Sequence, residues 1–177
     1  ITDEEGAATN FSYDDQGNVV TKTDPMGYSI TRTYDTTFNK PLTEVNKVAD
    51  HTSAWTYDAQ GNLLSETNAQ GSTRTFTYNS FGQLVAQTNF RGHSTQHTYS
   101  PEGDLATTTD SESNLTRFGY DGLGRLITQI NPRNFTTTYT YDKNDNLTKL
   151  VGPTAYTLRY VYDANDRLKT EVDANGG

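Results

Sequence analysis

The feature that most constrains this chain is a tyrosine that returns about every 21 residues along the whole sequence. In the stretches "YDAQGNLL" at residues 57–64 and "YDGLGRLI" at residues 120–127, the tyrosine precedes Asp, two variable residues, Gly, a polar residue and Leu. Self-similarity at a fixed period indicates a repeat architecture, in which each unit is stabilised by packing on its neighbours. We therefore expect one structural unit repeated eight times.

Four positions of the repeat carry the same kind of residue in most copies, and we expect them to be structural. The repeating tyrosines are Tyr13, Tyr34, Tyr57, Tyr78, Tyr99, Tyr120, Tyr141 and Tyr162. The glycine four residues later is Gly17, Gly61, Gly82, Gly103 or Gly124, and it is replaced by Phe38, Asp145 and Asp166 in the other copies. The aliphatic residue six positions after the tyrosine is Val19, Leu63, Leu84, Leu105, Leu126, Leu147 or Leu168. A second ring usually stands two residues before the tyrosine, at Phe11, Trp55, Phe76, Phe118, Tyr139 and Tyr160, with Arg32 and His97 as exceptions.

One copy departs from this spacing. In "YDTTFNKPL" the aliphatic residue is Leu42, two residues late, which accounts for the single tyrosine spacing of 23.

A second turn signal lies between the tyrosines, as in "DPMG" at residues 24–27 and "NAQG" at 68–71. Asp or Asn at the first position of a turn accepts from the backbone two residues on, and Gly at the fourth tolerates a positive φ. Between the turns run segments rich in Thr, Val, Tyr and Phe with period-two alternation, such as "TRTFTY" at residues 73–78, which predicts strands. Each repeat is therefore predicted to be a β-hairpin with Leu across from Tyr.

The predicted fold class is all-β: tandem hairpins of about 21 residues that form a long curved or spiral antiparallel β-strip. Roughly sixteen strands at about 4.8 Å each would extend for about 75 Å, and open twisted sheets beyond about ten strands curl, split or close. We expect the rings and the leucines on the concave face. The register stays open, because Leu64, Val85 and Ile127 add a second apolar residue after the leucine position and each Gly could introduce a bulge.

The repeat also predicts the domain organisation: residues 1–177 form a single array of eight repeats without capping units. The stretches "DEEG" at residues 3–6 and "DANG" at residues 173–176 occupy the same phase of the repeat. We therefore expect a segment of a longer array, whose unpaired edge strands associate end to end or pair with adjacent repeats of a parent chain.

Composition excludes several classes of function. The net charge is −8 and the 14 Lys and Arg residues are dispersed, which argues against a nucleic-acid partner. No stretch is apolar enough for insertion into a membrane. The chain has no Cys, so it has neither disulfides nor thiolate metal sites.

The sequence offers no strong candidate for catalysis or for a cofactor. Six aspartates could supply an acid pair for glycoside hydrolysis, but all recur directly after the tyrosine, where capping a turn explains them; they are Asp14, Asp35, Asp58, Asp121, Asp142 and Asp163. The motifs "DKNDN" at 142–146 and "DANDR" at 163–167 resemble the start of a calcium loop, but they lack its Gly and distant Glu, so we interpret them as turns.

The histidines His51, His93 and His97 could be considered as metal ligands. His93 and His97 are four residues apart, about 13 Å along a strand, so we interpret all three as isolated residues. We expect no enzyme activity, no cofactor and no metal.

The combination of "YDxxGxL", the second turn signal and a returning ring-x-Tyr-Asp resembles the YD repeat of the rearrangement-hotspot (Rhs) family, over the entire chain. That family includes bacterial polymorphic toxins, the toxin-complex C components, wall-associated repeat proteins and animal teneurins. The resemblance implies a β-strip wound into a hollow shell that encloses a toxin or presents an extracellular surface. A terminal core motif with an autoproteolytic Asp, a toxin domain and a delivery domain are not seen in these residues.

The function expected from the resemblance is the wall of an Rhs-type shell that encapsulates or presents a toxin or other cargo domain. The alternative is an extracellular module that binds carbohydrates or cell surfaces, because a column of rings such as Trp55 can stack on sugars. The partners would be an enclosed cargo in the first case and glycans in the second. In either case we expect a protein that is secreted or displayed at a bacterial cell surface.

Overall fold

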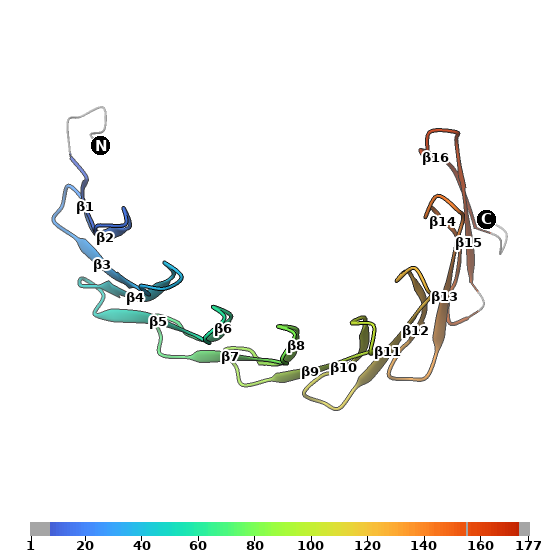
Figure 1. Ribbon diagram of the computed structural model, residues 1–177, viewed down its shortest axis with the longest axis horizontal. Helices are drawn as coiled ribbons and strands as arrows, with labels where there is room; N and C mark the ends of the chain where they lie inside the picture. The colour runs from blue at the N-terminus through green and yellow to red at the C-terminus, as the bar shows by residue number, and fades with distance from the viewer. Residues whose placement is uncertain (1–7, 155, 174–177) are drawn as a thin grey trace. The chain divides into compact units, whose positions relative to one another are not determined.

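The computed structural model describes residues 8–154 and 156–173. These residues form two compact units, divided between Ser94 and Thr95. The described part of the chain contains strands and turns and no helix, so the predicted all-β class is confirmed (Figure 1). The stretch at residues 3–6 and all but the first residue of the stretch at 173–176 lie outside the described residues, so the predictions about the ends and about a single array stay predictions.

Sixteen strands occur within the described residues. The first unit contains β1 (Asn10–Tyr13), β2 (Val19–Thr23), β3 (Ser29–Tyr34), β4 (Pro41–Asn46), β5 (His51–Tyr57), β6 (Leu63–Thr67), β7 (Thr73–Tyr78) and β8 (Leu84–Thr88). The second unit contains β9 (Ser94–Tyr99), which begins at the boundary, β10 (Leu105–Thr109), β11 (Leu115–Tyr120), β12 (Leu126–Ile130), β13 (Thr136–Tyr141), β14 (Leu147–Val151), β15 (Thr157–Tyr162) and β16 (Leu168–Asp173).

Within each unit the strands are hydrogen-bonded in chain order, and all the pairs are antiparallel. Each repeat contributes a hairpin whose first strand ends at the repeating tyrosine. We call the turn that closes this hairpin the YD turn, and the turn that leads to the next hairpin the linking turn. YD turns and linking turns alternate along the chain, so the YD turns of a unit lie along one edge of its sheet and the linking turns along the other.

Every YD hairpin in residues 8–154 and 156–173 contains a β-bulge, whereas the pairs across linking turns, such as β6 with β7 and β12 with β13, are regular. In β5 and β6, Tyr57 pairs with Leu63 and Thr56 pairs with Ser65, so Leu64 is the extra residue. The register therefore places Leu across from Tyr, as expected. It also explains why a second apolar residue so often comes after the leucine, because that residue occupies the bulge.

The second repeat differs from the expectation. Its tyrosine, Tyr34, pairs with Pro41 and not with Leu42, and Thr33 pairs with Thr43. Leu42 therefore occupies the bulge. Part of the extra length lies in the YD turn, in which Asn39 donates its N–H to the carbonyl of Asp35 and takes the positive φ of 56°. The longer spacing is thus divided between the turn and the strands.

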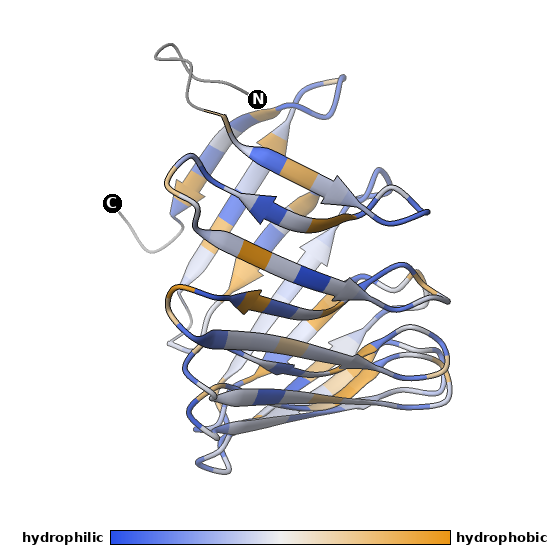
Figure 2. Ribbon diagram, turned by 90° about the vertical axis from the view of Figure 1, so that its left-hand side faces the viewer, coloured by the Kyte–Doolittle hydropathy of each residue, from blue (hydrophilic) through white to orange (hydrophobic). Residues whose placement is uncertain are grey.

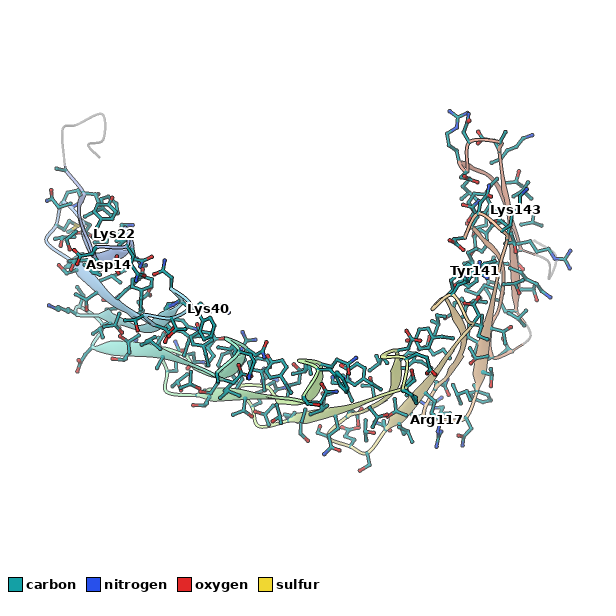
Figure 3. All side chains as sticks on the ribbon, in the orientation of Figure 1. Asp14, Lys22, Lys40, Arg117, Tyr141 and Lys143 are labelled. Carbon is teal, nitrogen blue, oxygen red and sulfur yellow. The ribbon has the colours of Figure 1, made fainter. Side chains whose placement is uncertain are left out.

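The two faces of each sheet differ in chemistry. Along β7 the side chains of Arg74, Phe76 and Tyr78 are half-buried and those of the intervening threonines are exposed. We call these the ring face and the threonine face. In the second unit Tyr141 lies on the ring face and Arg117 on the opposite face (Figure 3). The alternation of apolar and polar residues along the strands is visible in Figure 2.

The threonine face is joined by hydroxyl pairs across neighbouring strands. The Oγ atoms lie 2.6 Å apart in Thr33 and Thr43, 2.6 Å in Thr56 and Ser65, and 2.7 Å in Thr98 and Thr107. Such pairs add to the backbone ladder, because β-branched hydroxyl residues fit the pleated surface and satisfy each other.

Neither unit has a conventional core. Among the described residues no apolar side chain is buried, and the repeating rings are half-exposed. The repeating tyrosines therefore do not pack as fully buried rings in this sheet. A single layer of strands has nothing stacked on either face, so its stability comes from the ladders, the turns and the contacts between neighbouring hairpins.

Candidate functional surface: the YD turns and the ring face

The YD turn is built by its aspartate. In the turn at residues 58–62, Oδ1 of Asp58 accepts from the N–H of Gln60 at 2.9 Å and from that of Asn62 at 2.8 Å. Gly61 donates its N–H to the Asp58 carbonyl at 3.0 Å. The linking turns use the same geometry, with Asp24 accepting from Met26 and Tyr28. One carboxylate or amide oxygen thus satisfies two backbone donors that the ladder leaves free.

The fourth residue of these turns takes a positive φ, which is why glycine recurs there. Gly61, Gly82 and Gly124 have φ of 83°, 77° and 78°, as the turn pattern predicts. Asp145 and Asp166 occupy the same position with φ of 66° and 59°. They keep the left-handed conformation at a steric cost that glycine avoids.

The turn aspartates are poor candidates for general acids. A hydrogen bond from the Asn62 side chain lowers the pKa of Asp58, and one from the Arg125 guanidinium lowers the pKa of Asp121. Asp14 and Asp163 have lowered pKa values for the same kind of reason, through Asn18 and Arg167. A general acid at neutral pH needs a raised pKa, so these shifts support the structural interpretation of the aspartates.

In four of the repeats the tyrosine hydroxyl joins its hairpin to the one before it. The Tyr57 hydroxyl donates to the carbonyl oxygen of Pro41 at 3.0 Å, and the Tyr141 hydroxyl donates to that of Leu126 at 2.9 Å. The same bond is made by Tyr34 to Val19 and by Tyr162 to Leu147. The acceptor is always the residue that begins the preceding strand, next to the bulge.

The polar residue before the leucine position joins one YD turn to the next. The Arg125 guanidinium contacts Asp121 at 2.7 Å in its own turn and donates to Oδ1 of Asp145 at 2.7 Å and to the carbonyl of Asp142 at 3.0 Å in the next turn. Its guanidinium carbon lies 5.0 Å from the centre of the Tyr141 ring. The side chain thus bridges two hairpins and covers the tyrosine between them.

Other YD turns make the same connection with different donors. Asn146 donates to Oδ1 of Asp166 at 2.7 Å, and the Lys40 ammonium donates to the Gly61 carbonyl at 2.5 Å. The Phe38 ring also covers Gly61, where an added Cβ would approach it to 3.0 Å. The replacement of Gly by Asp at 145 and 166 therefore coincides with a donor at the matching position of the preceding turn.

The ring column is held by polar and ionic neighbours on the ring face. Nε of Arg32, which replaces a ring, lies 2.8 Å from Oε2 of Glu44, and Nδ1 of His97 lies 3.0 Å from Oγ1 of Thr108. The Arg74 guanidinium lies between two rings, 5.3 Å from the centre of Phe76 and 5.1 Å from that of Phe90. Trp55 is half-buried beside its cross-strand partner Glu66.

The structure does not bring the histidines together as ligands. In residues 8–154 and 156–173, no group of three His, Cys, Asp or Glu side chains could hold a metal ion. The two sequences that resemble calcium loops form YD turns, with Asp142 accepting from the N–H groups of Asn144 and Asn146. Their interpretation as turns is confirmed.

Two grooves lie between successive YD turns, two repeats apart in sequence. The first is lined by Asp58, Asn62, Tyr78 and Phe81, among others, and the second by Glu102, Asp104, Phe118 and Tyr120, among others. They occur where the residue before the leucine position is the short Asn62 or Asp104. The sequence analysis noted a polar residue before the leucine but assigned it no role, although it is polar in seven of the eight copies, Pro41 being the exception.

Comparison with known proteins identifies the repeat. The model of the RHS repeat family matches residues 13–49, 57–95, 99–136, 124–157 and 141–177, which is most of the chain. The chain therefore belongs to the RHS repeat family. No curated protein matches the sequence at a significant level.

Solved structures show the same fold. A structure of the Photorhabdus luminescens Tc holotoxin pore that contains a mutant TccC3 matches with a TM-score of 0.68 and 19% identity, over 91% of this chain and 10% of that chain. The TcdB2–TccC3 complex without its hypervariable C-terminal region matches with a TM-score of 0.69 and 19% identity, again over 91% and 10%. The chain thus spans about a tenth of the length of these toxin chains.

Proposed function

We propose that this chain is a non-catalytic wall segment of an Rhs-type β-shell, and that the shell encloses or presents a toxin or other cargo domain. The observation that carries the proposal is the single layer of strands in which no apolar side chain of the described residues is buried. A domain that works alone buries a core, whereas a wall keeps two accessible faces. The similarity in fold to Tc toxin chains supports the same assignment.

The contacts of the repeat suit a wall. Backbone ladders, the tyrosine hydroxyl bond and the bridge through Arg125 all join nearest neighbours, and they recur with the repeat. Hydrogen bonds lower the pKa of Asp14, Asp58, Asp121 and Asp163, and these carboxylates are occupied as acceptors within their turns. In this proposal the segment holds its shape and leaves the chemistry to the cargo, and the whole protein is secreted or displayed by a bacterium.

Protease protection in the full-length protein tests this function. With the shell intact, we expect the cargo region to resist a protease that degrades the isolated cargo. Thr75→Pro in the middle of β7 removes the N–H that donates to Oγ1 of Thr88 in β8 at 2.9 Å and places a ring in the strand, and we expect it to open the wall and restore cleavage. Cargo that is cleaved equally fast in the intact protein and in isolation would contradict the proposal.

A second candidate function is carbohydrate binding, and the two grooves between YD turns favour it. Each combines a tyrosine ring, Tyr78 or Tyr120, with polar side chains such as Asn62 or Asp104. Aromatic faces and planar polar groups are the usual means of holding a small polar ligand. Glycan-array binding that is lost in Tyr78→Ala would support this function. Loss of binding in Trp55→Ala instead would place the glycan on the ring column and not in the grooves.

A further inference from the structure

We propose that the bond between Asp121 and Gly122 is a site of covalent modification, at which the aspartate isomerises to isoaspartate, and that Arg125 keeps this reaction slow in the folded chain. Asp121 is the one aspartate of the sequence that is followed by glycine. Glycine offers the least steric hindrance to attack by its own backbone nitrogen, because it has no Cβ. The inference does not depend on whether the sheet encloses a cargo.

The reaction needs the two residues and water. The backbone nitrogen of Gly122 attacks Cγ of Asp121 and forms a new N–C bond, while one carboxyl oxygen leaves as water with the amide proton and the carboxyl proton. A second water then opens the cyclic succinimide. When the bond from the nitrogen to the main-chain carbonyl carbon of Asp121 breaks, the chain continues through Cγ. An isoaspartate results, and its longer backbone no longer fits the YD turn.

The backbone nitrogen of Gly122 is available for this attack. Its N–H has no hydrogen-bond acceptor among residues 8–154 and 156–173. Gly122 is exposed, and a Cβ added there would meet nothing within 4 Å. Both Asp121 and Gly122 also line the second of the two grooves between YD turns, so water reaches the bond that would break.

The carboxyl group of Asp121, in contrast, is held in place. Its Oδ1 accepts from the N–H of Leu123 at 2.9 Å and from that of Arg125 at 3.1 Å. Its Oδ2 accepts from Nε of Arg125 at 2.8 Å and lies 2.7 Å from Nη2 of the same guanidinium. The side chain must leave these bonds and take up a proton before Gly122 can attack. The Arg125 hydrogen bond also lowers the pKa of Asp121, which disfavours the protonated form.

Ageing of the full chain in water labelled with heavy oxygen tests the inference. Each opening of the succinimide adds one labelled oxygen to the peptide that contains Asp121, and fragmentation in a mass spectrometer distinguishes isoaspartate from aspartate. We expect Arg125→Ala to take up label about tenfold faster than the original chain, because it loses the charge-assisted hydrogen bonds to Oδ2. Gly122→Ala, which the open space around the residue tolerates, should reduce the uptake in either chain to background.

A double variant separates release of the carboxyl group from general loosening of the turn. Arg125→Ala also breaks the ion pair with Asp145, and Asp145→Gly relieves the strained residue that remains while leaving Asp121 without its guanidinium. We expect the double variant to take up label as fast as Arg125→Ala when all chains are aged well below their thermal midpoints. Uptake in Arg125→Ala no faster than in the original chain, or a double variant that returns to the original rate, would overturn the inference. Equal uptake at Asp58, which precedes an alanine, would overturn the choice of site.

Discussion

At the scale of single residues, each recurring letter of the repeat has a separate physical task. The aspartate closes the turn through two backbone N–H groups, the glycine supplies the positive φ, and the tyrosine hydroxyl bonds to the preceding strand. These tasks explain why aspartate gives way to asparagine at residue 79 without loss of the turn, since the amide oxygen of Asn79 accepts the same bonds.

The tyrosine hydroxyl bond can be isolated by removing a single oxygen. We expect Tyr57→Phe to destabilise the chain by about 1 kcal/mol, the net worth of one hydrogen bond, because it leaves the Pro41 carbonyl without its donor. Tyr120→Phe is the matched control, because no hydrogen bond from its hydroxyl is seen within the described residues. Equal thermal stability of the two variants would show that the bond contributes nothing.

Truncation of a whole ring measures how much the half-exposed tyrosines contribute. Because Tyr120 is only half-buried, we expect Tyr120→Ala to cost about 2 kcal/mol, less than the roughly 3 to 5 kcal/mol of a fully buried aromatic. Chemical denaturation checks this value. A loss near the upper range would mean that another layer covers the ring face in solution.

Substitution of two glycines in one turn distinguishes the cost of backbone strain from the effect of an added side chain. Gly124 has a φ of 78°, whereas Gly122 has no positive φ and open space around it. We expect Gly124→Ala to cost about 1–2 kcal/mol and Gly122→Ala to be neutral or stabilising by up to about 1 kcal/mol. Equal effects at both positions in thermal unfolding would contradict the turn geometry.

At the scale of elements, the hairpins are joined by their turns and by the threonine face as well as by their ladders. Arg125 reaches across to Asp145, and Asn146 reaches across to Asp166. These bridges replace part of what a second layer of structure would supply. They predict that neighbouring hairpins unfold together.

The bridge predicts coupling between Arg125 and the residue that replaces glycine in the next turn. Arg125→Ala should lower the thermal midpoint, because Asp145 then keeps its left-handed conformation without a partner. Asp145→Gly should rescue much of that loss, whereas the same change in the original chain should gain less. Additive effects in this double-mutant cycle would mean that the two turns do not interact.

A gap in the hydroxyl ladder predicts a stabilising substitution. Gly119 pairs with Thr128 at the position where other hairpins hold pairs such as Thr98 and Thr107. We expect Gly119→Thr to stabilise the chain by about 1 kcal/mol once the Thr128 hydroxyl rotates away from the added Cβ, and Gly119→Ala to gain less. A loss of stability in Gly119→Thr would show that Thr128 cannot adjust.

The sequence was sufficient to predict the strands and turns, but it did not show whether a second layer of structure covers the sheet. The period of the tyrosines and the Asp-x-x-Gly turns predicted the hairpins, the pairing of Tyr57 with Leu63 and the positive φ of Gly124. The bulge at Leu64 could not be assigned, because two adjacent apolar residues satisfy either register. The partial exposure of Tyr120 could not be predicted, because a repeat pattern does not say whether anything covers its rings. The bridging role of Arg125 depends on a contact with the next repeat, which no single copy reveals.

At the scale of the whole molecule, the net charge of −8 comes largely from the YD turns. Hydrogen bonds lower the pKa values of Asp14, Asp58, Asp121 and Asp163 in the YD turns and of Asp110 in a linking turn. A lowered folded-state pKa adds stability that is fully present above the unfolded value and is lost as the pH falls through the folded value.

Acid should therefore unfold the chain in a defined window. We expect stability to be constant from neutral pH down to about pH 4 and to fall below it, as the turn carboxylates take up protons. Asp58→Asn keeps the acceptor oxygen but cannot titrate, so its acid transition should be shallower. Thermal midpoints measured at several pH values check this, and an identical acid transition in the variant would contradict it.

We propose above that this chain is part of the wall of a β-shell and not a self-contained domain. Electron cryo-microscopy of the full-length protein tests it most directly. We expect density for a hollow body with residues 8–154 and 156–173 in its wall. A strip with both edges in solvent, or a solid body with no enclosed volume, would contradict it.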